Sequence, residues 1–203
     1  MPRLRAYFTF SSSYSYLAWQ RVTHLHPERY AGVDVEWVPV NFLRLSELQG
    51  LPPKPPVPHQ LAYNARDAKR WADAYGVPFL TPERRFGPTQ DAVKGHLMAE
   101  DAGPELAAAW RDAVFSAYRV EGRDLSDRGM LASLAQDVGL PDYLARLDDA
   151  RLEERLERNT REAFRAGAPG VPYFVIDGDG YWGNDRLAWV EARLSGQRAP
   201  SSL

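Results

Sequence analysis

The 203-residue sequence contains no cysteine. This absence excludes disulfide bonds, thiolate ligands for metal ions and a protein thiol as a catalytic nucleophile. Any sulfur chemistry that the protein carries out must therefore use a thiol that it binds.

The sequence also lacks long apolar runs and a strong net charge. No segment approaches the apolar length of a membrane-spanning helix, and the N-terminal MPRLRAYFTF is too short an apolar stretch for the core of a signal peptide. The formal net charge is -2, so the chain lacks the broad positive field with which proteins neutralise nucleic-acid phosphates. We therefore expect a cytoplasmic protein with no membrane or nucleic-acid partner.

The histidines are few, and their spacing does not match a metal site. His24 and His26 are two residues apart, so they face different sides of a helix, and no H-E-x-x-H pattern occurs. We predict that no metal is bound. We expect all four histidines, which include His59 and His96, to be solvated at the surface.

What the sequence does contain is typical of a globular protein with a full core. Hydrophobic residues make up 44% of the chain and charged residues 26%. The length suits one compact domain, or one domain with a large insertion.

The first part of the chain predicts a β-α-β unit. Residues 4–10 alternate like a strand, residues 12–26 carry apolar side chains at helical spacing, and residues 32–40 form a second β-rich run. A right-handed crossover with parallel strands is the usual form of such a unit. The proline-rich residues 41–58 that follow predict a long loop.

The remaining chain predicts a helical segment and then a second β-containing unit. Residues 59–167 carry several helical patterns that end on or near glycine. The Asp-Gly-Asp-Gly turn at 177–180 indicates a hairpin, and an amphipathic helix follows it. We therefore expect an α/β thioredoxin-like fold with a large all-helical insertion, divided into residues 1–58, 59–167 and 168–203.

Three stretches of the sequence carry a family resemblance. YFTFSSSYSYLAW, YNARDAKRWADAYGVPF and GVPYFVIDGDGYWGNDRL resemble the 2-hydroxychromene-2-carboxylate isomerase family, which is related to kappa-class glutathione transferases and to DsbA-type oxidoreductases. The resemblance implies a DsbA-like or kappa-like fold, glutathione as cofactor and a homodimer. It further implies glutathione-dependent cis-trans isomerisation of a small aromatic carboxylate similar to 2-hydroxychromene-2-carboxylate.

Ser12 is the predicted catalytic residue. In thioredoxin-like redox proteins this turn carries C-x-x-C, and here Ser12 and Ser15 take those positions. A hydroxyl cannot form the mixed disulfide of thiol exchange, so DsbA-like oxidase activity is excluded. The resemblance implies that Ser12 instead contacts the glutathione sulfur, where the helix N-terminus favours an anion. A plain helix N-cap is the alternative role.

Two further segments are predicted to bind glutathione. The resemblance implies a cis bond between Val171 and Pro172, with the Val171 backbone pairing with glutathione as with a short β-strand. Asn184-Asp185-Arg186 is expected to bind the charged γ-glutamyl end of glutathione, with Asp185 at its ammonium and Asn184 and backbone N–H groups at its carboxylate. For Arg186, holding the loop in place is the alternative. Simple capping of the next helix is the alternative for Asn184 and Asp185.

Candidates for the substrate side lie in the proline-rich segment. Lys54 is a candidate for attracting a substrate carboxylate or the glycine carboxylate of glutathione, with Asn41 and Arg44 assisting. Exposed loop residues without a role are an equal alternative for each.

Two other functions fit the same residues. A kappa-like glutathione transferase would use the same activated thiolate but release a stable conjugate. A non-catalytic binding or chaperone-like thioredoxin-fold protein is the second alternative, because Ser13 and Pro53 stand where the family usually has proline and asparagine.

Overall fold

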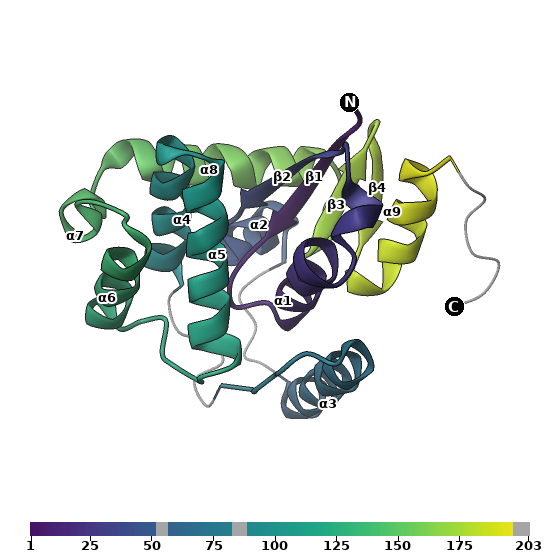
Figure 1. The fold of residues 1–203 in the computed structure, drawn as a ribbon, viewed down its shortest axis with the longest axis horizontal. Coiled ribbons are helices and arrows are strands. Elements are labelled where there is room, and N and C mark those ends of the chain that lie inside the picture. Colours follow the sequence, from purple (N-terminus) through teal and green to yellow (C-terminus); the bar gives the residue numbers. More distant parts are fainter. Residues whose placement is uncertain (52–56, 83–88, 197–203) are drawn as a thin grey trace.

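The computed structural model describes residues 1–51, 57–82 and 89–196. Figure 1 shows a small sheet near the middle of the molecule, with α4, α5, α6 and α7 together at one end and α1 and α9 at the other. None of the described helices combines the length and the apolarity that crossing a bilayer requires.

One mixed sheet of four strands contains all the described β-strands. Its order is β2-β1-β3-β4, with β1 parallel to β2 and antiparallel to β3, and with β3 antiparallel to β4. The strands are β1 (Arg3–Phe8), β2 (Asp34–Pro39), β3 (Tyr173–Ile176) and β4 (Asp179–Trp182). The predicted β-α-β and β-β-α units are therefore confirmed, and β1 at the centre joins them.

Helices occupy the regions predicted to be helical, and a further helix, α2, lies in the segment predicted to be a loop. They are α1 (Ser13–Trp19), which continues as a π-helical segment (Gln20–Leu25), a 3-10 turn (Pro27–Tyr30), α2 (Phe42–Leu48), α3 (Pro58–Tyr75), α4 (Gln90–Ala102), α5 (Pro104–Arg119), α6 (Arg128–Val138), α7 (Tyr143–Arg146), α8 (Ala150–Arg165), a 3-10 turn (Asn184–Arg186) and α9 (Leu187–Leu194). The predicted helical insertion is confirmed.

Helix α2 corrects the prediction of a loop over residues 41–58. The first proline of that segment is residue 52, so the stretch before it can form a helix. The Asn41 side chain caps this helix by accepting a hydrogen bond from the Arg44 backbone N–H at 3.2 Å. The helix ends at Leu48, ahead of Gly50 with its φ of 73°, so the prolines lie beyond it and do not prevent it.

The hairpin turn is shorter than predicted. Strand β3 ends at Ile176 and β4 begins at Asp179, so Asp177 and Gly178 alone form the turn. Their φ angles are 52° and 81°. A two-residue turn with both φ angles positive matches the right-handed twist of the strands that it joins.

The two faces of β1 pack against different helices. Leu4, Ala6 and Phe8 are fully buried in the same core cluster as side chains of α1 and of the helical insertion. Tyr7 points to the opposite face, where α2 and α8 cover the sheet.

Aromatic packing joins the sheet to the insertion. The rings of Phe8 and Phe10 lie 5.3 Å apart, and Phe10 meets Phe115 of α5 at 4.9 Å. Trp19 and Trp37 pack edge to face at 5.1 Å beside them. The core is thus continuous across the predicted boundaries of the insertion. The division of the chain into residues 1–58, 59–167 and 168–203 stays a prediction.

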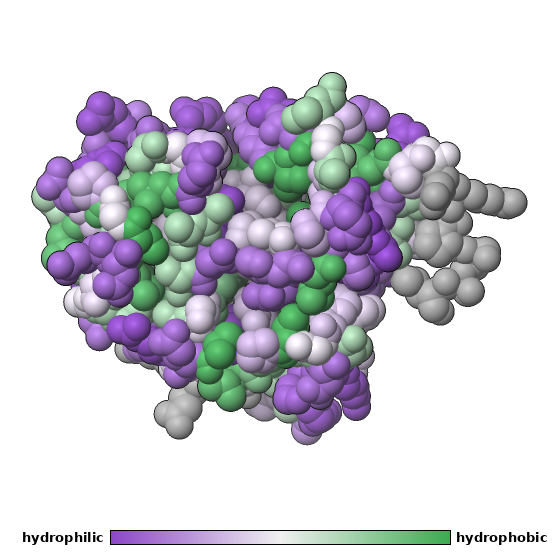
Figure 2. Space-filling model, in the orientation of Figure 1, coloured by the Kyte–Doolittle hydropathy of each residue, from purple (hydrophilic) through white to green (hydrophobic). Residues whose placement is uncertain are grey.

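The molecular surface mixes polar and apolar residues. On the face shown in Figure 2, hydrophilic residues are interspersed with apolar ones, and apolar residues gather over the end formed by α6 and α7. Leu144 of α7 is among the exposed ones.

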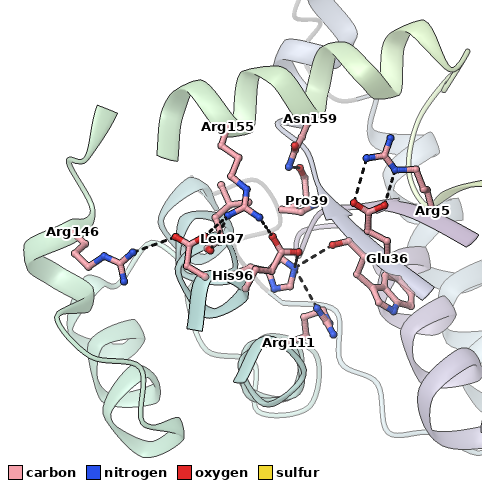
Figure 3. A network of polar contacts seen from close by, with 12 residues as sticks. Arg5, Glu36, Pro39, His96, Leu97, Arg111, Arg146, Arg155 and Asn159 are labelled. Carbon is pink, nitrogen blue, oxygen red and sulfur yellow. Dashed lines mark hydrogen bonds and ion pairs between the residues drawn. The ribbon is translucent and has the colours of Figure 1, made fainter. Parts of the chain in front are cut away.

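A buried polar network lies where α4 meets β2, α5 and α8 (Figure 3). His96 is fully buried, so the prediction that every histidine is solvated is wrong at this position. Its Nε2 lies 3.1 Å from Glu100 Oε1 and 3.3 Å from the Trp37 carbonyl oxygen. Arg111 Nη1 lies 3.3 Å from the same nitrogen, and Arg155 Nη2 donates to Glu100 Oε2 at 2.7 Å.

This environment favours the neutral form of His96. Burial lowers the pKa of His96 below its ordinary value, and the charge of Arg111 lowers it further, against the opposing effect of Glu100. Burial also lowers the pKa of Arg111, to about 10. A neutral imidazole that donates Nε2–H to the Glu100 carboxylate satisfies the carboxylate without adding a second buried cation beside Arg111.

We expect His96 to make the protein less stable at mildly acidic pH. The unfolded chain takes up a proton at this histidine below about pH 6.5, whereas the folded chain does not. The free energy of unfolding should therefore fall as the pH drops, by up to about 1.4 kcal/mol per pH unit for one proton. Urea unfolding of the wild type and of His96→Gln between pH 7 and pH 5 measures the difference in slope.

The exposed His59 offers a matched control, and His59→Gln should keep the wild-type slope. Equal slopes in the wild type and His96→Gln would show that His96 is protonated in the folded protein.

Candidate active site

The candidate site is a cavity of about 350 Å³ at the start of α1. The turn from Ser11 to Tyr14 forms one wall, and the loop from Pro169 to Val171 faces it. Residues of α3 line a further wall, and the lining is completed by Thr9, Phe42, Thr81, Arg119 and Trp182. Two predicted site residues, Ser12 and Val171, therefore lie in one cavity although 159 positions separate them in the chain.

Ser12 connects the two sides of this cavity. Its Oγ accepts a hydrogen bond from the Ser15 N–H at 3.1 Å, which makes Ser12 the N-cap of α1. The same hydroxyl donates to the Val171 carbonyl oxygen at 3.3 Å. Capping and a position on the cavity wall are thus combined in one side chain.

The predicted cis bond between Val171 and Pro172 is confirmed. The Pro172 carbonyl accepts from the Gly183 N–H at 2.9 Å, which ties this loop to the end of β4. In the part of the chain that the structure describes, the N–H of Val171 has no hydrogen-bond partner. A backbone donor of this kind beside a cavity can pair with an extended peptide.

Asn184, Asp185 and Arg186 form a short 3-10 turn against α1 and do not line the 350 Å³ cavity. Asn184 is buried, with Nδ2 3.5 Å from the Tyr75 hydroxyl, and Asp185 pairs with Arg186 at 2.8 Å. No side chain caps α9, so the alternative that Asn184 or Asp185 caps that helix does not hold. Their role in binding glutathione stays a prediction.

The substrate candidates lie in different places. Asn41 lines a second cavity of about 200 Å³ next to the first. The Arg44 guanidinium pairs with Glu157 at 3.2 Å and with Glu47 at 3.0 Å, and it lines neither cavity. Lys54 lies outside the described residues.

The two cavities share Thr9, Ser11 and Phe42. Thr9 is 3% exposed, and its hydroxyl makes no hydrogen bond to another described residue. Apolar side chains that include Val93 and Leu156 form much of the second cavity. A hydroxyl that lines a cavity and makes no hydrogen bond within the protein is available to a ligand.

Most of the cavity lining was not among the predicted site residues, and Thr9, Phe42, Arg119 and Trp182 belong to this group. Trp182 is 55% exposed and covers Gly170, where an added Cβ would lie 3.0 Å from the indole Nε1. Trp182 lies in the GYWGNDRL stretch, which carries part of the family resemblance and so could have indicated it as a site residue. Arg119 lies far from every recognised motif, so only the folded chain brings it here.

A larger, shallow hollow of about 640 Å³ lies between α6 and α7. Asp142 and Tyr143 are the only ionisable side chains among its described lining residues. The smaller cavities at the start of α1 therefore hold the better candidate site, because polar and charged groups converge there.

Two tyrosines near the cavity remain neutral donors. The Tyr14 hydroxyl donates to Asp67 Oδ2 at 2.8 Å, and burial together with this carboxylate raises the pKa of Tyr14. The Tyr16 hydroxyl donates to the Pro78 carbonyl at 2.7 Å, and burial raises the pKa of Tyr16 to about 12. Neither phenol is poised for proton transfer near neutral pH.

Comparison with known proteins fits this fold and site. The family model for the DSBA-like thioredoxin domain matches residues 3–195. A curated 2-hydroxychromene-2-carboxylate isomerase from Sphingobium xenophagum is 30% identical, over 93% of this chain and 95% of its own. The chain belongs to the 2-hydroxychromene-2-carboxylate isomerase family. The shared name of its relatives supports an isomerase function.

Solved structures agree with this family assignment. A 2-hydroxychromene-2-carboxylate isomerase superimposes with a TM-score of 0.83 at 25% identity, covering 96% of this chain and 95% of the other. The cytosolic disulfide reductase DsbM from Pseudomonas aeruginosa, solved with GSH, has a TM-score of 0.66 at 20% identity and covers 95% of this chain and 99% of its own. The second likeness shows the fold alone.

We expect Ser12→Ala to weaken the fold as well as the site. The variant loses the N-cap hydrogen bond to the Ser15 N–H and the bond to the Val171 carbonyl. The free energy of unfolding should fall by about 1 kcal/mol, the typical cost of losing a cap. Urea unfolding measures it, with Ser13→Ala as control because that side chain makes no cap bond. Equal losses in the two variants would contradict the capping role.

Proposed function

We propose that the chain is a glutathione-dependent isomerase of an aromatic compound similar to 2-hydroxychromene-2-carboxylate. The observation that carries the proposal is the Ser12 hydroxyl, which lies on the 350 Å³ cavity opposite the Val171 backbone. A chain without cysteine needs a bound thiol for sulfur chemistry, and this hydroxyl is a donor that a bound sulfur can use.

Two features support a peptide-like thiol in this cavity. The unpartnered N–H of Val171 and its carbonyl oxygen offer the donor and acceptor that an extended peptide backbone requires. Glutathione combines such a backbone with a thiol. DsbM, which shares the fold and was solved with GSH, supports the choice of this thiol.

When bound, glutathione would supply a thiolate that adds reversibly to the conjugated alkene, so that the former double bond rotates before the carbon–sulfur bond breaks again. Ser12 would redirect its O–H from the Val171 carbonyl to the sulfur. A hydrogen bond donated to an anion is stronger than one to a neutral carbonyl, so the exchange favours the ionised thiol. Both the N–H and the carbonyl oxygen of Val171 would then be free to form hydrogen bonds with the peptide backbone of glutathione.

The second cavity would hold the aromatic substrate. Its apolar side chains suit a flat ring, and the Thr9 hydroxyl would form a hydrogen bond with a polar group of the substrate. Because the two cavities share Thr9, Ser11 and Phe42, the ring would lie next to the thiol and not across the protein from it.

Binding of glutathione tests the first half of the proposal. Calorimetric titration of reduced glutathione at two pH values should show binding to the wild type with release of a proton. Ser12→Ala should bind about 10-fold more weakly above the thiol pKa, as expected for one charge-assisted hydrogen bond. Ser13→Ala should match the wild type. Absence of binding to the wild type would refute the proposal, and a stable conjugate as the product would indicate a transferase instead.

Thr9→Val tests the position of the substrate. The change keeps the shape of the side chain and removes a hydroxyl that no described residue satisfies, so the free energy of unfolding should stay within about 0.5 kcal/mol. The KM for 2-hydroxychromene-2-carboxylate should rise about 5- to 10-fold, the value of one hydrogen bond.

Thr160→Val is the matched control for this test. The Thr160 hydroxyl accepts from the Asn41 N–H at 3.0 Å and donates to the Leu156 carbonyl at 2.7 Å, so this variant should lose about 1–2 kcal/mol of stability. An unchanged KM in Thr9→Val would place the substrate elsewhere.

A further inference from the structure

The first turn of α4 opens on the 200 Å³ cavity. Thr89 is the N-cap of this 13-residue helix, and both Thr89 and Gln90 line the cavity. The Val93 N–H donates to the Thr89 carbonyl oxygen at 3.1 Å, so the N–H groups of the three residues before Val93 have no partner within the helix. The Thr89 side chain makes no cap hydrogen bond to them. Free N–H groups give a helix end a partial positive charge, which favours an anion.

The Thr9 side chain is a second, independent feature that points to a ligand in this cavity. Thr9 follows strand β1, is 3% exposed and lines the cavity. Its hydroxyl makes no hydrogen bond to another described residue. The cavity is therefore lined by an unused hydroxyl from the sheet as well as by the uncapped end of α4.

Asn41 adds a hydrogen-bond donor to the same cavity. Its Oδ1 accepts from the Arg44 N–H at 3.2 Å, and because an N–H requires an acceptor, this contact fixes which way the amide is turned. The other end of the amide is then the Nδ2 group, which donates to none of the described residues. The free polar groups around the cavity are thus mainly donors, which is the arrangement that a carboxylate needs.

The described walls of this cavity carry no charge of their own, because none of the lining residues is ionisable. Asp91, the acidic residue in the first turn of α4, is not part of the lining and pairs with Arg128 at 2.7 Å. The Arg44 guanidinium likewise lies outside the lining and pairs with Glu157. An anion in the cavity would therefore depend on the helix end and on neutral donors.

We propose that the N-terminal end of α4, together with the Asn41 amide, binds the carboxylate of the aromatic substrate. The inference rests on the proposed function, because it takes its ligand from the substrate that this function requires. The ring would lie against apolar side chains such as those of Val93 and Leu156. The carboxylate would thus fix the orientation of the ring beside the thiol.

Two unreactive ligands test the inference. Chromane-2-carboxylate has the ring system and the carboxylate of the proposed substrate but no alkene to which a thiol could add, and chromane-2-carboxamide is its neutral counterpart. Calorimetric titration into the full chain should show that the carboxylate binds about 10-fold more tightly than the carboxamide, as expected for one charge-assisted hydrogen bond. Equal affinities, or no binding of the carboxylate, would overturn the inference.

Substitutions at the N-cap separate the effect of charge from that of folding. Thr89→Asp places a carboxylate where the ligand would compete for the same N–H groups, so chromane-2-carboxylate should bind about 10-fold more weakly and the carboxamide within about 2-fold of the wild type. Its stability in urea should not fall, because Asp is at least as good an N-cap as Thr. Thr89→Asn caps the helix without a charge and should keep most of the preference for the carboxylate.

Asn41→Asp tests the amide from the other side of the cavity. The variant keeps an oxygen for the Arg44 N–H and replaces the Nδ2 donor by a negative oxygen, so it should bind chromane-2-carboxylate about 10-fold more weakly. Gln136→Glu, the same amide-to-carboxylate change at an exposed position of α6, should bind like the wild type. Wild-type affinity in both Thr89→Asp and Asn41→Asp would overturn the inference, and a loss in Gln136→Glu alone would place the ligand in the hollow between α6 and α7.

The outcomes keep this inference apart from the proposed function. If the wild type does not bind glutathione while chromane-2-carboxylate behaves as expected in all variants, the proposed function fails and the carboxylate site stands. If glutathione binds as expected and the wild type does not prefer the carboxylate over the carboxamide, this inference alone fails.

Discussion

The packing of Phe10 against Phe115 determines how the rest of the site is built. Phe10 is the last apolar residue before the serine-rich turn, and its ring meets that of Phe115 on α5 at 4.9 Å. This contact places α5 alongside the turn. Arg119 is four residues further along the same helix and so lies on the same face as Phe115. The packing of α5 in the hydrophobic core thus places Arg119 on the wall of the 350 Å³ cavity.

The elements with strong local patterns were predictable from the sequence. Alternation of apolar residues identified β1 and β2, and the Asp-Gly pair at 177–178 identified the hairpin. Helix α2 was not predicted, because the prolines that argue against a helix all follow it and say nothing about residues 42–48. The cis bond before Pro172 was predictable only from family resemblance, since its sequence neighbours carry no local signal for it.

The candidate site was predictable only in part, for a physical reason. Ser12 and Val171 belong to recognisable motifs, and their hydrogen bond joins the two. Thr9 and Arg119 gain their importance from burial and from neighbours more than 30 residues away, which no local pattern encodes. The burial of His96 was missed for the same reason, because its partners Trp37 and Arg111 come from other elements.

Phe42 belongs to the walls of both cavities, and it is 45% exposed. A side chain shared in this way cannot move for one ligand without changing the space left for the other. Thermodynamic linkage makes such an effect reciprocal, so each ligand changes the affinity for the other by the same factor. If both cavities are filled as proposed, their occupancies would be coupled through this one aromatic ring.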